Sequence, residues 1–250
     1  MPAMTRFALL TNPRCGSTYL ATLLNSHPQV LCHGELFYQH QVFYAVGHRD
    51  GSLHLATPAE RDADPAAFLD KVWAHPFGSS AVGFKLVAGQ HPGAFAGLFA
   101  DPEIRVIVLR RRNRLKKFVS ALVAEREQMW THYKHRFRPE DLKPVQVEVS
   151  LDGLGSYLAG EQAFYDGLMA ELVRRPKPCA EVFYEDLFAG GEAIERLLRF
   201  LGVAAETQGL EPATHKRNSR RLADLIVNFD QLAHQVAGTE LEAELHDCGY

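Results

Sequence analysis

The chain has 250 residues, of which 46% are hydrophobic and 23% are charged, and its formal net charge is -3. These values are typical of a single globular α/β domain over residues 1–250, and a charge so close to zero does not point to a nucleic-acid partner. No apolar run has the length of a membrane span, and the N-terminal one is too short for a signal peptide, so we expect a cytoplasmic protein. Four cysteines without C-x-x-C spacing favour reduced thiols over disulfides or a zinc site.

The segment 6–24 predicts a strand, a tight polar turn and a helix. Its first part is a short apolar run typical of a buried parallel strand, and its last part carries leucines at helical spacing. Ser17 or Thr18 is expected to cap that helix. Such a turn directs backbone N–H groups and the positive end of a helix dipole at one point. It therefore predicts an anion site, to which Arg14 adds a positive charge.

The turn does not match two common phosphate-binding loops. The ATP loop G-x-x-x-x-G-K-[ST] needs a glycine where Thr11 stands and a lysine where Ser17 stands. A phosphatase-like loop needs an arginine six residues after Cys15, and that residue is Ala21. The string PRCGSTYL instead resembles the 5'-phosphosulfate loop of sulfotransferases that use 3'-phosphoadenosine 5'-phosphosulfate (PAPS), written P-[KR]-[SC]-G-[ST]-[TS]-x-L.

A candidate base follows in the segment 30–37, which predicts a short strand that breaks at Gly34. The break would release Glu35 at the carboxyl end of the sheet, where open α/β folds bind their ligands. This G-E pair resembles the carboxylate assigned as base in bacterial carbohydrate and glycolipid sulfotransferases of the trehalose sulfotransferase type. The resemblance implies that Glu35 is the base, with His33 and His91 in reserve.

Residues 81–87 predict a buried strand that contains Lys85. A buried ammonium group normally reaches an anion or a carboxylate. The string GFKL resembles the family segment that brings a lysine to the transferring sulfonate, which implies a catalytic role for Lys85. In the animal cytosolic branch a histidine two residues later is the base, but here that residue is Val87.

A second anion motif lies between a predicted strand at 104–109 and a helix whose apolar stripe covers residues 115–123. The residues between them form a basic cluster at the end of the strand. Arginine offers bidentate contacts to phosphate, and a hydroxyl adds one more donor. The string RNRLKKFVS resembles the 3'-phosphate motif R-[ND]-x(6)-S of the same family, which implies that Arg112 and Ser120 hold the 3'-phosphate.

Further cofactor contacts follow from the resemblance alone. Tyr19 occupies the place of an aromatic residue that stacks on adenine in many relatives. The string FYEDL resembles a Y-E-D-L element whose tyrosine lies by the adenine, and this implies the same for Tyr184. A basic segment before a predicted helix carrying positions 225, 226 and 229 resembles a loop that closes over the cofactor, which adds Lys216 and Asn218.

Two stretches are expected to form acceptor-side loops. The first, 39–65, has no sustained hydrophobic period, and the second, 130–150, is basic, aromatic and interrupted by proline. The rings of the second stretch suit a pocket for a sugar or an acidic acceptor, and they equally suit a dimer surface or the outer packing of a loop.

Together these features predict an α/β fold with a P-loop-like parallel sheet flanked by helices, the sulfotransferase fold. The resemblance implies in-line transfer of sulfonate from PAPS to a carbohydrate or glycolipid hydroxyl, leaving 3'-phosphoadenosine 5'-phosphate. Glu35 removes the hydroxyl proton, while Arg14, Lys85 and loop N–H groups counter the developing charge. No metal is expected. The loop residues implied in cofactor binding are Arg14, Cys15, Gly16, Ser17, Thr18 and Tyr19.

Two alternatives stay open at this point. One is an ATP-dependent small-molecule kinase on a similar scaffold, and the other is a non-catalytic protein that binds a nucleotide or polyanion. The expected partner is a small-molecule or glycan acceptor. Nucleic acid and an integral membrane segment are not expected, and a homodimer is left open.

Overall fold

The computed structural model describes residues 4–49, 51, 53–131, 133–134, 138, 145–214 and 221–247. The chain forms two compact units. The first contains Met1–Arg110 and Gly167–Pro212, and the second contains Arg111–Asp166 and Ala213–Tyr250. One of the three points at which the chain passes between them, Asp166 to Gly167, falls within the continuous helix α6 (Leu151–Arg174). The expectation of a single domain over residues 1–250 stays a prediction.

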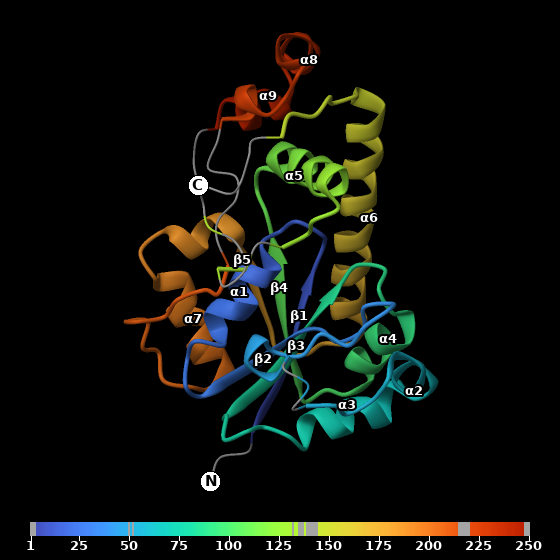
Figure 1. The fold of residues 1–250 in the computed structure, drawn as a ribbon, viewed down its shortest axis with the longest axis vertical. Helices are drawn as coiled ribbons and strands as arrows, with labels where there is room; N and C mark the ends of the chain where they lie inside the picture. Colours follow the sequence, from blue (N-terminus) through green and yellow to red (C-terminus); the bar gives the residue numbers. More distant parts are fainter. Residues whose placement is uncertain are drawn as a thin grey trace. The chain divides into compact units, whose positions relative to one another are not determined.

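The first unit is built on a five-stranded parallel sheet in the order β2-β3-β1-β4-β5 (Figure 1). The strands are β1 (Thr5–Thr11), β2 (Val30–Glu35), β3 (Ala81–Val87), β4 (Ile104–Arg110) and β5 (Cys179–Phe183). The helical elements of this unit, besides its part of α6, are α1 (Ser17–Leu24), η1 (Val46–His48), α2 (Pro58–Ala63), α3 (Pro65–Trp73), α4 (Pro92–Ala100), η3 (Tyr184–Phe188) and α7 (Glu192–Leu201). The predicted α/β fold class with a parallel sheet is confirmed.

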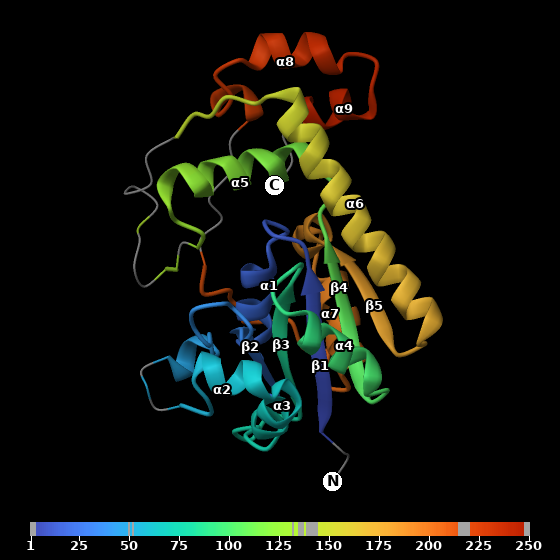
Figure 2. The ribbon, with the colours of Figure 1, turned by 90° about the vertical axis from the view of Figure 1, so that its right-hand side faces the viewer.

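Helices cover both faces of this sheet, as a parallel sheet requires. On one face α1 and α7 share a core cluster with Leu9 of β1 and Ile107 of β4. The helix α3 lies on the other face (Figures 1 and 2). Its Trp73 packs against Phe84 of β3 with ring centres 5.9 Å apart. Because neighbouring residues of a strand face opposite sides, each strand supplies both layers and is apolar along most of its length.

The first acceptor-side segment is more regular than its sequence suggests. It contains η1 and α2, and α2 begins with a capping box in which Thr57 and Glu60 bond each other's backbone N–H groups. The expectation of an irregular loop over 39–65 is therefore wrong for residues 58–63. The helix is only six residues long, too short to show a hydrophobic period.

The second unit consists of helices around its own core. Its described elements, besides its part of α6, are α5 (Arg114–Glu127), η4 (Leu222–Asp224), α8 (Phe229–Val236) and α9 (Glu240–His246). Leu115 of α5, Leu232 of α8 and Leu245 of α9 belong to one buried cluster. Fully buried Lys117 forms an ion pair with Glu161 of α6, which supplies the partner that a buried ammonium needs.

The predicted helix carrying positions 225, 226 and 229 is wrong in its first part. Ile226 forms a parallel bridge with Val147, and Val227 donates its N–H to the Val147 carbonyl at 2.9 Å. The apolar pair at 225 and 226 is thus held by pairing with a distant segment, and the helix begins only at Phe229. This tertiary contact is invisible to a local hydrophobic period.

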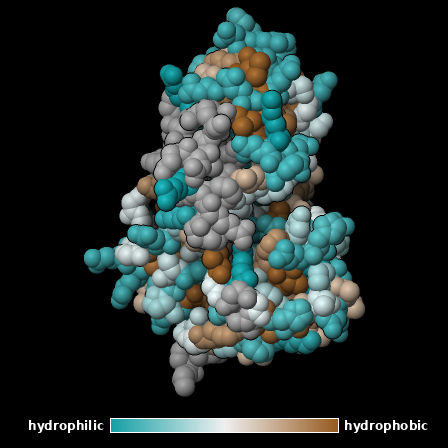
Figure 3. All heavy atoms as spheres, in the orientation of Figure 1, coloured by the Kyte–Doolittle hydropathy of each residue, from teal (hydrophilic) through white to brown (hydrophobic). Residues whose placement is uncertain are grey.

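The surface seen in Figure 3 is mainly hydrophilic with small separate hydrophobic areas. Among the helices that the structure describes, none combines the length and the apolar character needed to cross a bilayer.

We predict that Gly83→Ala destabilises the first unit. A Cβ at this position would lie 2.5 Å from atoms of the Phe7 ring on the neighbouring strand β1, and overpacking of this kind costs roughly 1 to 3 kcal/mol. The measurement is the free energy of unfolding from denaturant titration. The matched control is Gly97→Ala on α4, where a Cβ meets no atom within 4 Å and helix propensity favours alanine. Equal stability of the two variants would contradict the expected clash.

Candidate active site

The helix after β1 begins without a side-chain cap. Gly16 is the N-cap residue, with φ 82° in the left-handed region, and no described side chain caps α1. The expectation that Ser17 or Thr18 forms the cap is wrong, because α1 already includes both residues. The N-terminus of a helix offers N–H groups and a positive dipole end, so this turn suits an oxyanion.

Glycine is required at the end of this turn. A Cβ at position 16 would overlap the Tyr184 ring, and its φ is one that side chains with a Cβ rarely adopt. The backbone of Arg14 also lies in the left-handed region, with φ 65°, which is uncommon for residues other than glycine. Cys15 is fully buried in the core cluster, whereas the Arg14 side chain is partly exposed. Of these two, Arg14 is therefore the residue placed to present its side chain to a ligand.

A β-bulge at Gly34 brings the predicted base to the predicted lysine. His33 of β2 pairs with Phe84 of β3, but the next pair joins Glu35 and Lys85, so the register shifts by one residue. Paired residues share a face of the sheet, and this shift turns Glu35 to the face that carries Lys85. The Lys85 Nζ atom lies 2.7 Å from Glu35 Oε1.

Lys85 also connects this carboxylate to the turn. Its Nζ donates a hydrogen bond to Thr18 Oγ1 in the first turn of α1 at 2.9 Å. Only 5% of Lys85 is exposed, so both contacts offset the cost of removing the ammonium group from water. An anionic partner was expected for this buried lysine, and in the structure that partner is the Glu35 carboxylate. These contacts join Glu35, Lys85 and Thr18 in one polar cluster at the carboxyl ends of the strands.

Gln90 holds the second oxygen of the predicted base and was not expected from the sequence. Its Nε2 donates to Glu35 Oε2, and its Oε1 accepts the backbone N–H of Val87 at 3.0 Å. The bond to Val87 fixes which end of the amide faces the carboxylate. A polar residue just past the end of β3 was the one available signal, because the carboxyl ends of parallel strands carry ligand sites.

The two reserve histidines have other partners. His33 Nδ1 accepts the Ala45 N–H at 3.1 Å, and burial, with a smaller effect of nearby His48, lowers the pKa of His33 to about 3. His33 therefore stays neutral at physiological pH. His91 Nδ1 accepts the Ala94 N–H at 2.9 Å and caps α4. These contacts favour the carboxylate over either histidine as the proton acceptor.

An aromatic corner lies beside the turn. The Tyr19 ring centre is 6.2 Å from that of Tyr184 and 5.0 Å from that of Phe188. Tyr184 is buried against Gly16, whereas Tyr19 is partly exposed, and burial raises the pKa of Tyr19. Both rings thus present flat surfaces next to the predicted phosphosulfate loop. Their contact with adenine stays a prediction.

The residues of the second motif belong to the second unit. Arg112 is exposed just before α5, and Ser120 is buried within that helix. Asn113 caps α5 by accepting the Lys116 N–H at 2.7 Å. That Arg112 and Ser120 bind the same nucleotide as Arg14 stays a prediction. Lys216 and Asn218 lie outside the described residues, as do positions 132, 135–137 and 139–144 of the second acceptor-side segment.

A parallel α/β sheet with a helix N-terminus and a carboxylate–lysine pair at its carboxyl ends suits an enzyme that binds an anionic ligand. A family model described as the Sulfotransferase family matches residues 8–207. The chain therefore belongs to the sulfotransferase family, which confirms the predicted family and class of enzyme. This match favours the sulfotransferase over both alternatives that the sequence left open.

The chain is also similar to proteins of comparable length along most of its sequence. Nodulation protein H of Rhizobium tropici is 26% identical over 247 residues, covering 95% of this chain and 92% of the relative. Nodulation protein H of Rhizobium meliloti strain 1021 is 27% identical over 248 residues, covering 90% of this chain and 89% of the relative. A sulfotransferase from Alicyclobacillus acidocaldarius, known from its crystal structure, shares the fold with a TM-score of 0.51 and 16% sequence identity. The match covers 98% of this chain and 97% of that protein.

We predict that Gly16→Ala is more destabilising than a glycine substitution that disturbs only the backbone. Gly89→Ala is the matched control, because it has φ 78° but no atom within 4 Å of a new Cβ. The backbone effect alone costs about 1 to 2 kcal/mol, and the overlap with Tyr184 adds roughly 1 to 3 kcal/mol at position 16. Denaturant unfolding measures both variants. If Gly16→Ala costs no more than Gly89→Ala, the contact with Tyr184 does not restrict the turn.

Proposed function

We propose that this sulfotransferase moves the sulfonate group of PAPS to a hydroxyl group of a carbohydrate or glycolipid, with Glu35 as the base. The observation that carries the proposal is the pair of contacts made by Lys85. The same ammonium group bonds the candidate base at 2.7 Å and the first turn of the anion-binding helix at 2.9 Å. A proton acceptor and an anion site are thereby joined at one point.

The residues of the turn fit the 5'-phosphosulfate end of such a donor. The N-terminus of α1 has no side-chain cap among the described residues, and Gly16 keeps a side chain out of the turn. Arg14 and Lys85 supply positive charge, and Thr18 supplies a hydroxyl group. When bound, PAPS supplies a sulfonate group that passes to the acceptor oxygen as the bond from sulfur to the phosphate oxygen breaks.

The side chains of the site then have separate tasks. Glu35 accepts the proton of the acceptor hydroxyl, and its two oxygens are oriented by Lys85 and Gln90. Lys85 and Arg14 counter the negative charge that develops on the sulfonate and on the departing phosphate oxygen. Donors held in place before the reaction are effective here because they need no rearrangement when the charge appears.

Two features support a carbohydrate or glycolipid acceptor. The G-E element resembles that of bacterial carbohydrate sulfotransferases. In addition, Tyr38 lies three positions after Glu35, and 39% of it is exposed. A partly exposed ring three positions after the base suits the apolar face of a sugar, with which flat rings stack.

The direct test is incubation of the protein with PAPS carrying ³⁵S in its sulfonate, together with a panel of oligosaccharides and glycolipids. We expect label in at least one acceptor and stoichiometric release of 3'-phosphoadenosine 5'-phosphate. Transfer only to a non-carbohydrate acceptor from a cell extract would leave the assignment of PAPS as donor intact and overturn the assignment of a carbohydrate or glycolipid as acceptor. An absence of label in every fraction would overturn the donor as well.

We predict that Glu35→Gln retains the affinity for 3'-phosphoadenosine 5'-phosphate and loses turnover. Glutamine can still accept a hydrogen bond from Lys85, but it cannot take up the hydroxyl proton, a contribution of roughly 100- to 10,000-fold. Calorimetric titration measures the affinity, and label transfer measures the turnover. The exposed Glu206→Gln serves as the control and should behave as wild type. Full activity in Glu35→Gln would remove Glu35 from the role of base.

We predict that Arg112→Ala weakens 3'-phosphoadenosine 5'-phosphate by roughly 1.5 to 3 kcal/mol, the range for a hydrogen bond to a charged group. Binding of ADP, which has no 3'-phosphate, should change little. Calorimetry with both nucleotides makes the comparison, and Arg126→Ala near the other end of α5 is the control. An equal loss for the two nucleotides would contradict the assignment of Arg112 to the 3'-phosphate.

A further inference from the structure

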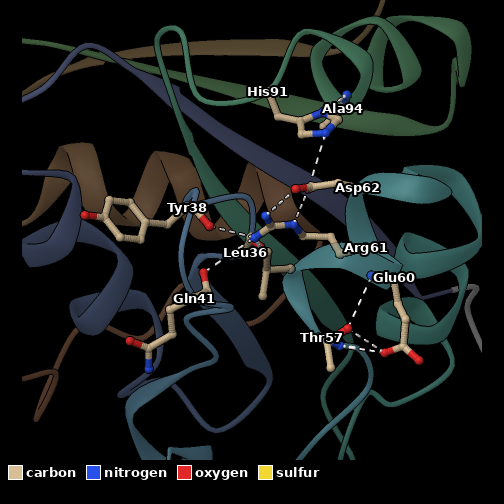
Figure 4. A network of polar contacts seen from close by, with 9 residues as sticks. All are labelled: Leu36, Tyr38, Gln41, Thr57, Glu60, Arg61, Asp62, His91 and Ala94. Atoms are coloured by element: carbon tan, nitrogen blue, oxygen red, sulfur yellow. Dashed lines mark hydrogen bonds and ion pairs between the residues drawn. The ribbon is translucent and has the colours of Figure 1, made fainter.

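A fully buried arginine holds the backbone that follows the candidate base. Arg61 of α2 is 1% exposed, and its Nη1 donates to the carbonyl oxygens of Leu36 at 2.8 Å and Tyr38 at 2.7 Å (Figure 4). The same atom lies 3.5 Å from the Gln41 carbonyl oxygen. The segment held in this way begins one residue after Glu35.

The guanidinium group is itself fixed by its neighbour in sequence. Arg61 Nε lies 2.7 Å from Asp62 Oδ1, and Nη2 lies 3.1 Å from Oδ2, which makes a bidentate pair. These bonds from Arg61 hold the pKa of Asp62 below its usual value, with a further contribution from His91. His91 Nε2 is 3.4 Å from Asp62 Oδ1 (Figure 4). Asp62 therefore joins the buried arginine to the start of α4.

These contacts form a closed chain of residues that begins and ends at Glu35. His91 directly follows Gln90, and Gln90 donates to Glu35 Oε2. One side of this closed chain fixes the backbone after Glu35 through Arg61, and the other fixes its side chain through Gln90. Both sides meet at Asp62.

The position of Glu35 explains why such a support is needed. It is the last residue of β2, which lies at the end of the strand order, and it directly follows the bulge at Gly34. Past this point the chain leaves the sheet, so ladder hydrogen bonds no longer fix it. A general base must stay within hydrogen-bond reach of its proton, and a displacement of about 1 Å can lower a rate 100-fold.

We propose that Arg61 and Asp62 form a positioning pair for the Glu35 carboxylate. Neither side chain contacts Glu35 directly, and each acts through the loop or through His91 and Gln90. This inference rests on the proposed function, because it assigns the pair to the orientation of the proposed base. It gives α2, near the end of the first acceptor-side segment, a role in turnover.

The first test compares Asp62→Asn and Arg61→Lys with wild type. Asparagine keeps one acceptor oxygen for Arg61, and 45% of the Asp62 side chain is exposed, so we expect this variant to fold. Lysine keeps the charge but loses the fork that reaches both Asp62 and the loop. We expect kcat to fall roughly 10- to 100-fold with unchanged affinity for 3'-phosphoadenosine 5'-phosphate. Asp70→Asn, at an exposed position of α3, is the matched control.

A double-mutant cycle then separates positioning from general damage. If Asp62 acts through Glu35, Asp62→Asn should cause no further loss of turnover in the Glu35→Gln background. A loss of the same size in both backgrounds would overturn the proposal, because it would show an effect independent of the base.

Amide hydrogen exchange supplies a readout that needs no turnover. The N–H groups of Tyr38 and Phe43 donate to the Glu35 carbonyl at 3.2 and 3.3 Å. We expect Arg61→Lys to accelerate exchange in the peptide covering 36–43 and not in β1. Unchanged exchange would overturn the positioning pair even in an active enzyme. Accelerated exchange in a protein whose wild type transfers no label from PAPS would instead overturn the proposed function and leave the loop support intact.

Discussion

The ion pair between Lys85 and Glu35 is the interaction on which the candidate site depends. An ammonium group inside an apolar strand costs several kcal/mol of desolvation, and a single carboxylate rarely compensates for it fully. Here a carboxylate and the Thr18 hydroxyl share the task. A hydrophobic residue at position 85 would fill the same space without that cost. A charged pair at this point is therefore explained better by a role in catalysis than by a contribution to stability.

The bulge at Gly34 is the feature of the backbone that makes this pair possible. In an unbroken ladder Gly34 would stand opposite Lys85, and Glu35 would face the apolar layer of α3. A Cβ at position 34 would crowd Phe43 and Arg49, so glycine lets the returning chain pass close to the strand. The same residue thus turns the carboxylate and gives room to the segment that Arg61 holds.

Much of this arrangement could be predicted from local sequence. The strand at 81–87 and the end of α7 at Gly202 follow from apolar runs and a C-terminal glycine, since such signals act over a few neighbouring residues. Lys85 was singled out because a buried ammonium group needs an anionic partner. The role of Glu35 as base came instead from the resemblance of its G-E pair to that of bacterial sulfotransferases. Lys85 could be expected to have an anionic partner, although no local pattern identifies which carboxylate that is.

The rest depends on contacts between distant segments. Arg61 lies in a polar string, AERDADP, whose composition suggests an exposed loop, and its burial follows from carbonyl groups more than twenty positions earlier. Gln90 looks like an ordinary turn residue until the bulge brings Glu35 to it. No hydrophobic period encodes such contacts, because they are set by the packing of α2 and α4 beside the end of β2.

For the proposed reaction, the hydrogen bonds at the site leave bonding capacity for both reactants. A carboxylate has about four acceptor positions, and Lys85 and Gln90 occupy one on each oxygen of Glu35, which leaves capacity for an acceptor hydroxyl. An ammonium group has three donors, and Glu35 and Thr18 take two of those of Lys85 among the described residues. The third is available to an oxygen of the sulfonate. Because the inner partners already hold each group, the outer positions have fixed directions, and this is the condition under which preorganised donors lower a barrier.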